Sequence, residues 1–269
     1  MRRSLRAALL MRRRPAVAGA GRARPVRSDG YEFAELRGYV GGDDPRRVDW
    51  AATARVGALQ TRVMYEEHGL YLAVALDGSP SMRVGRDRSC YARAFDAGAA
   101  WLGLAEGADR CARIVDERLI APRERRGRSA ARACLALEDH ALGSFAGQLA
   151  ATCALVPTDA SLLLVSDFFE IEQLAGGLGS LARRCDCTAL IVRDPWFAGL
   201  GLAGFVRLRD AEDARTRRLF VGARERARYL AASAAREAVA RARLRGLGIR
   251  AAVLGEDANE ALQRAFAEG

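Results

Sequence analysis

The clearest chemical pattern in the sequence is one carboxylate followed by two hydroxyls. Asp77, Ser79 and Ser81 stand two residues apart in the segment DGSPSM, directly after an apolar run. In a loop that curls over the end of a strand, all three side chains can face one point. Hard oxygen donors of this kind suit Mg²⁺, with Mn²⁺ as a second possibility. The segment is therefore a candidate metal site.

A second acid occupies an equivalent place further along the chain. Residues 69–76 (GLYLAVAL) and 160–166 (ASLLLVS) are continuous apolar runs, which are typical of buried parallel strands. Asp77 directly follows the first run and Asp167 directly follows the second. Ligand sites in parallel sheets lie at the carboxyl ends of the strands. We therefore expect both carboxylates at one edge of one sheet, with Asp167 as a further metal ligand, direct or through water.

Strands and helices alternate from residue 69 onward. Further strands are predicted at 187–192 and 249–254, with strand pairs at 110–122 and 204–221. Helices are predicted at 89–106, 129–138, 144–156, 171–184, 224–246 and 259–266. This alternation predicts an α/β, Rossmann-like fold whose mostly parallel sheet carries helices on both faces. We assign residues 69–269 to this domain.

The N-terminal part of the chain differs in composition. Residues 1–29 carry nine arginines and one acid, within a chain of 269 residues and net charge +10. This composition predicts a disordered basic arm, which could contact nucleic acid or anionic lipid. Residues 30–68 combine aromatic residues, glycines and many charges without a long period. They are predicted to form a short β-rich extension packed on the main domain.

Location and redox state follow from two further features. No apolar run reaches the roughly 20 residues of a membrane span, and the first apolar run is too short for a signal peptide. The six cysteines show no C-x-x-C spacing. We expect a cytoplasmic protein with free, mostly buried thiols and membrane contact that is at most peripheral.

Two groups of residues carry a family resemblance. Asp77, Ser79 and Ser81 resemble the metal-ion-dependent adhesion site of von Willebrand A domains. Residues 37–50 (RGYVGGDDPRRVDW) resemble the hallmark of the bacterial domain-of-unknown-function 58 family, whose members carry a von Willebrand A-like domain. The resemblance covers about residues 30–267. It implies a von Willebrand A-like fold and a MoxR-type AAA+ ATPase as partner in the assembly or maturation of a protein complex.

The resemblance also implies site residues. Adhesion sites use a threonine between the two acidic strands, and no such threonine is evident here. We predict that Ser129 supplies this hydroxyl, because Thr152 falls inside a predicted helix. A structural alternative is that Asp77 and Ser79 cap the loop by accepting backbone N–H groups.

The family signature itself supplies candidate partner contacts. These residues are Asp43, Asp44, Arg46, Asp49 and Trp50. The alternative interpretation is a turn stabilised by its own salt bridges, with Trp50 and Tyr39 anchoring it to the domain.

Motifs for catalysis are weak in this sequence. The two histidines, His68 and His140, follow no buried strand, and neither G-x-S-x-G nor G-x-x-x-x-G-K occurs. We therefore expect a non-catalytic domain that binds an acidic side chain of a protein partner, without a small-molecule substrate. Two alternatives remain open. One is a magnesium-dependent phosphohydrolase that uses Asp77 and Asp167, although Ser79 stands where a second acid is expected. The other is nucleic-acid binding through the arginine arm.

Overall fold

The computed structural model describes residues 2–12, 31–41, 45–66, 69–84, 89–136, 144–193, 202–210 and 215–267. The chain divides into two compact units. One contains Met1–Arg14 together with Leu70–Gly269, and the other contains Pro15–Gly69.

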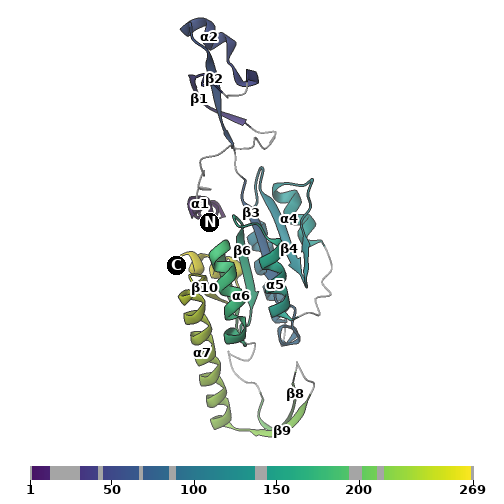
Figure 1. Cartoon of the computed structure of the whole chain (residues 1–269). Helices are drawn as coiled ribbons and strands as arrows, with labels where there is room; N and C mark the ends of the chain where they lie inside the picture. The colour runs from purple at the N-terminus through teal and green to yellow at the C-terminus, as the bar shows by residue number, and fades with distance from the viewer. Residues whose placement is uncertain are drawn as a thin grey trace. The chain divides into compact units, whose positions relative to one another are not determined.

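A six-stranded sheet forms the centre of the larger unit (Figure 1). Its strands are β3 (Tyr71–Leu76), β4 (Arg110–Val115), β5 (Arg118–Ile120), β6 (Ser161–Ser166), β7 (Asp186–Val192) and β10 (Arg250–Leu254). They lie in the order β10-β7-β6-β3-β4-β5, and all neighbours are parallel except β4 and β5. Counted in chain order this is the 3-2-1-4-5-6 arrangement of Rossmann-like folds, so the predicted fold class is confirmed. The order reverses between β3 and β6.

Helices cover both faces of this sheet, as predicted. On one face lie α3 (Cys90–Leu102), α4 (Gly127–Leu135) and α8 (Ala258–Ala267). On the other lie α5 (Phe145–Leu155), α6 (Ile171–Arg184) and α7 (Ala223–Gly246). Leu72 and Val74 of β3 pack on the first face, while Ala73 and Ala75 pack on the second. Burial on both faces explains why the strand sequences are continuously apolar.

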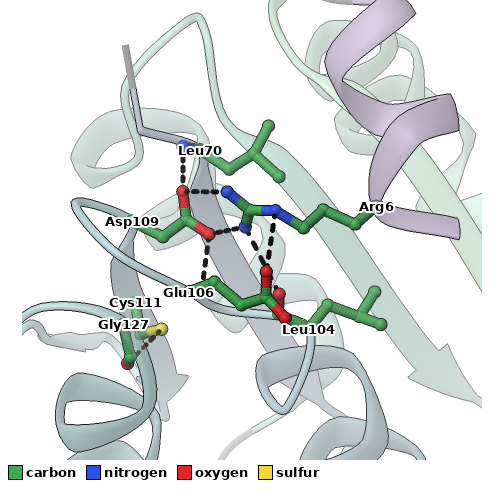
Figure 2. Close-up of polar contacts among 7 residues, drawn as sticks. All are labelled: Arg6, Leu70, Leu104, Glu106, Asp109, Cys111 and Gly127. Carbon is green, nitrogen blue, oxygen red and sulfur yellow. Dashed lines mark hydrogen bonds and ion pairs between the residues drawn. The ribbon is translucent and has the colours of Figure 1, made fainter. Parts of the chain in front are cut away.

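The N-terminal residues correct one prediction. Residues 2–12, expected to be disordered, form helix α1 (Arg2–Arg12). Leu5 and Leu9, one helical turn apart, are buried in the core that contains α8. Arg6 pairs with Asp109, which is fully buried and also accepts hydrogen bonds from the backbone N–H groups of Leu70 (2.6 Å) and Glu106 (2.8 Å) (Figure 2). The composition of residues 1–29 predicted a disordered arm because composition alone does not show that Leu5 and Leu9 share one face of a helix. Residues 13–29 lie outside the described residues.

The smaller unit contains an antiparallel pair and one helix. Strands β1 (Tyr31–Gly38) and β2 (Gln60–Glu66) pair along their length, with an irregularity between Phe33 and Glu35. A 3₁₀ turn, η1 (Pro45–Arg47), and helix α2 (Trp50–Val56) lie between them in the chain. The predicted β-rich segment therefore also holds a helix, and it belongs to the compact unit Pro15–Gly69.

The remaining elements are a 3₁₀ turn and a hairpin. The turn η2 (Pro80–Arg83) follows β3, and the hairpin pairs β8 (Gly204–Arg209) with β9 (Thr216–Val221), as predicted. All six cysteines are free and five of them are buried. Among the helices that the structure describes, none has the length and hydropathy needed to cross a membrane.

Candidate metal-binding site

Asp77 lies at the carboxyl end of β3, beside β6. Its backbone N–H donates to the carbonyl of Val165 (2.8 Å), which continues the β3–β6 ladder by one residue. Its side chain is almost fully buried, with 3% exposed. One carboxylate oxygen accepts from the hydroxyl of Ser166 (2.6 Å) and the other from the backbone N–H of Ser79 (2.9 Å). The carboxylate is thus fixed at the point where the strand order reverses, which is the usual ligand position in such sheets.

The two loop serines lie next to each other. The Oγ atoms of Ser79 and Ser81 are 3.1 Å apart and share a hydrogen bond in which either can be the donor. Pro80 starts the η2 turn between them, and fully buried Met82 fixes this turn to the core. Two neighbouring oxygens of an octahedral Mg²⁺ shell, each about 2.1 Å from the ion, are about 3 Å apart. The hydroxyl pair therefore fits two adjacent positions of that shell.

Asp167 follows β6 at the same edge. It is half-buried, and its Oδ1 atom accepts the backbone N–H of Phe169 (3.0 Å). The next residue, Phe168, has a positive φ of 49°, which is unfavourable for a non-glycine residue, and it is held there by burial. Its N–H donates to Oγ of Ser166 (3.0 Å), and this hydroxyl in turn donates to Asp77. Ser166 thus links the loops that carry the two acids.

The electrostatics of Asp77 favour a bound cation. Burial raises the pKa of the Asp77 carboxyl, the hydrogen bonds from Ser166 and Ser79 oppose that rise, and the nearby Asp167 carboxylate adds to it. Among the described residues, no group of three or more His, Cys, Asp or Glu side chains is placed to hold a metal. A metal here would depend on two carboxylates and on hydroxyls, and this donor set fits Mg²⁺ better than softer ions.

The raised pKa of Asp77 gives a prediction for stability. Below the ordinary carboxyl pKa of about 3.9, Asp77 is protonated in the folded and unfolded chains alike. As the pH rises through the raised folded pKa, ionisation disfavours the metal-free fold. Asp77→Asn should therefore unfold at a higher urea concentration than the unsubstituted chain at pH 7 in EDTA. This advantage should disappear near pH 3. An asparagine variant that is less stable at pH 7 would contradict this effect of burial.

Ser129 does not lie at this edge. It stands in the first turn of α4, and its hydroxyl donates to the carbonyl of Arg126 (3.0 Å). The start of α4 is fixed to the beginning of β4, because the N–H of Gly127 donates to the carbonyl of Asp109 (2.7 Å). Strand β5 runs antiparallel to β4 and returns the chain to the amino edge before α4 begins. Ser129 is therefore at the wrong end of the sheet to join Asp77.

Ser144 is a hydroxyl residue at the carboxyl edge that the sequence analysis did not single out. It caps α5 by accepting the N–H of Gly147 (3.2 Å), and α5 begins at the carboxyl edge because it leads into the start of β6. The following residue, Phe145, contacts Phe168 edge to face at 5.9 Å, which places the helix start beside the Asp167 loop. A Cβ at Gly147 would lie 3.4 Å from Oγ of Ser144. The sequence signal was an N-cap serine before a helix that precedes an acid-terminated strand.

The placement of the two serines gives a second prediction. Ser144→Gly should lower Mg²⁺ affinity by about tenfold, a typical effect for a residue that supports a metal site. Glycine keeps most of the N-cap stability, so the fold should persist. Ser129→Ala should leave the affinity unchanged. Calorimetric titration of both variants checks this, and the opposite ranking would return Ser129 to the site.

The predicted partner residues divide into three groups. Asp43 and Asp44 lie outside the described residues. Asp49 caps α2 by accepting the N–H of Ala52 (2.9 Å), so it has a structural function. Arg46 is exposed, and Trp50 is 69% exposed at the start of α2. The Trp50 ring is therefore not buried within its own unit.

The sheet order defines a Rossmann-like α/β domain with oxygen-bearing side chains at the strand-order reversal. The family model described as "Protein of unknown function DUF58" matches residues 35–239, and the chain belongs to this family. No curated protein matches the chain. A solved structure with similarity is the conserved hypothetical protein BatB from Bacteroides thetaiotaomicron, at 12% identity and a TM-score of 0.35. That alignment covers 67% of this chain and 99% of BatB.

Proposed function

We propose that this chain is a non-catalytic protein-interaction domain that binds one Mg²⁺ ion and uses it to hold a carboxylate of a protein partner. The observation that carries the proposal is the pair of hydroxyls 3.1 Å apart beside the buried Asp77. Ser79 and Ser81 would bind the ion directly, and Asp77 and Asp167 would supply negative charge. Ser144 would take the place of the missing threonine.

An open position on such an ion would accept an acidic side chain from a partner. Mg²⁺ retains exchangeable waters when the protein supplies few ligands, and a carboxylate can replace one of them. The exposed Phe169, next to Asp167, offers an apolar contact beside that position. These features support protein binding rather than turnover. From the family resemblance, we infer a MoxR-type AAA+ ATPase as the partner.

The test is capture of a purified MoxR-type ATPase by the immobilised chain. Capture should occur in Mg²⁺, disappear in EDTA, and disappear for Asp77→Asn, whose folding is checked by circular dichroism. Retained capture by the folded Asp77→Asn variant, or capture that is insensitive to EDTA, would contradict a metal-mediated contact.

A further inference from the structure

A second basic segment, distinct from residues 1–29 and called the arm from here on, extends from the same edge of the sheet as the candidate metal site. The arm consists of β8, β9 and residues 223–232 of α7 (Figure 1). Helix α7 leads into the start of β10, so its C-terminal end lies at the amino edge and its N-terminal end points past the carboxyl edge. No residue of 223–232 is buried, whereas Ser233, Ala240 and Leu244 are. At 1.5 Å per residue, this part of the helix without buried residues extends for about 15 Å.

The part of α7 that follows the arm, at Arg236 and Glu237, contacts loops at the metal-site edge. The Arg236 guanidinium lies over the ring of Phe169, 5.0 Å from its centroid. The next residue, Glu237, pairs with Arg193 just after β7, at 3.3 Å. These contacts hold α7 against two loops at the carboxyl edge. The arm is therefore attached beside Asp167.

One face of the hairpin combines aromatic rings with opposed arginines. Phe205 and Phe220 are direct cross-strand neighbours with ring centroids 5.3 Å apart, and they are 89% and 55% exposed. Arg207 is two residues after Phe205, and Arg218 is two residues before Phe220, so both arginines lie on the same face as the rings. Arg207 and Arg218 are themselves direct cross-strand neighbours. Like charges directly opposite each other destabilise a strand pair. An anion placed across both guanidiniums removes that cost.

Arginine dominates the charge of the whole arm. Its described residues, together with those that flank the hairpin turn, include eight arginines and two acids. The arginines are Arg207, Arg209, Arg215, Arg217, Arg218, Arg224, Arg226 and Arg228. Of the two acids, Glu225 accepts the backbone N–H of Gly222 (3.0 Å) and so caps α7. The sequence between the two strands also contains Glu212 and Asp213. The strands themselves therefore present positive charge and exposed rings.

The neighbouring edge limits what this arm can bind. Acids follow several strands there, among them Asp116 and Glu117 after β4, Asp167 after β6, and Glu256 and Asp257 after β10. An extended polyanion or a charged membrane plane would meet these acids next to the arm. A short acidic segment can lie on the arm and avoid them. Exposed arginine and aromatic residues are also the types that dominate protein-binding energy.

We propose that the arm binds a short acidic segment of a partner protein. Its carboxylates lie across Arg207 and Arg218, and an apolar side chain packs on Phe205 and Phe220. Charge-assisted hydrogen bonds to arginine provide the main polar contacts. This surface is separate from the metal site and needs no metal ion.

The test uses the full chain in EDTA and a short fluorescein-labelled peptide of glutamates interspersed with leucines. Fluorescence anisotropy should show saturable binding that weakens as salt increases. Arg207→Gln/Arg218→Gln should weaken it by about tenfold or more, while Arg207→Lys/Arg218→Lys should stay within about threefold of the unsubstituted chain. The matched control is Arg123→Gln/Arg125→Gln, which removes two exposed arginines at the amino edge and should change nothing.

Three outcomes would overturn the proposal. One is unchanged peptide binding in the arm variant, and another is an equal loss in the amino-edge control. The third is tighter binding of single-stranded DNA or of phosphatidylserine vesicles, which would assign the arm to nucleic acid or membrane. Asp77→Asn should bind the peptide normally, so a failure of the metal site leaves this result intact.

Discussion

Replacing Arg6 by methionine should lower the free energy of unfolding by about 3 kcal/mol, the usual cost of removing one partner of a buried ion pair. Arg6 neutralises Asp109, whose side chain is fully buried. Methionine keeps much of the aliphatic stem but leaves that carboxylate with only two backbone N–H donors. Urea denaturation followed by circular dichroism measures the change.

Arg3→Met is the matched control for this variant. Arg3 lies on the same helix and is exposed, so its loss should change the free energy of unfolding by less than about 0.5 kcal/mol. In Arg6→Met/Asp109→Asn the buried charge is absent, so part of the loss should return. Equal denaturation curves for Arg6→Met and Arg3→Met would show that the ion pair does not hold α1 in place.

Removal of both loop hydroxyls should strongly weaken the affinity for Mg²⁺. In Ser79→Ala/Ser81→Ala, the dissociation constant for Mg²⁺ should rise by about 100-fold or more, because loss of a mere supporting residue already costs 10- to 100-fold. The fold should persist, because both side chains are only partly buried and Met82 still anchors the loop. Titration calorimetry measures the dissociation constant.

A matched loss of two hydroxyls elsewhere provides the control. Ser129 and Ser180 are both in helices, where their hydroxyls donate to carbonyls of the preceding turn. Ser129→Ala/Ser180→Ala should bind Mg²⁺ as the unsubstituted chain does. If the Ser79 and Ser81 substitutions leave affinity intact while Asp77→Asn abolishes it, the ion is held by carboxylates and the hydroxyl pair is incidental.

The strands were the most predictable part of the fold. β3, β6 and β7 are buried on both faces, so their sequences are apolar without interruption and differ clearly from amphipathic helices. Helix α1 was missed because its signal is one leucine pair among many arginines. Its stability depends on a distant acid, Asp109, and no local pattern shows that contact.

The site was predictable where a residue directly follows a strand. Asp77 and Asp167 lie at one edge because parallel strands share their direction. The prediction that Ser129 joins the metal site was wrong because its position depends on β5. This strand runs antiparallel to β4 and returns the chain to the other edge before α4 begins. Ser166 was missed because a strand's last residue can point to either face, and only the tertiary fold directs its hydroxyl toward Asp77.

The most direct test of the account is calorimetric titration of Mg²⁺ into the purified chain, in parallel with the Asp77→Asn variant. The account predicts saturable binding at a single site in the unsubstituted chain and none in the variant. Equal binding by both proteins, or no saturable binding by the unsubstituted chain, would contradict a metal site at the carboxyl ends of β3 and β6.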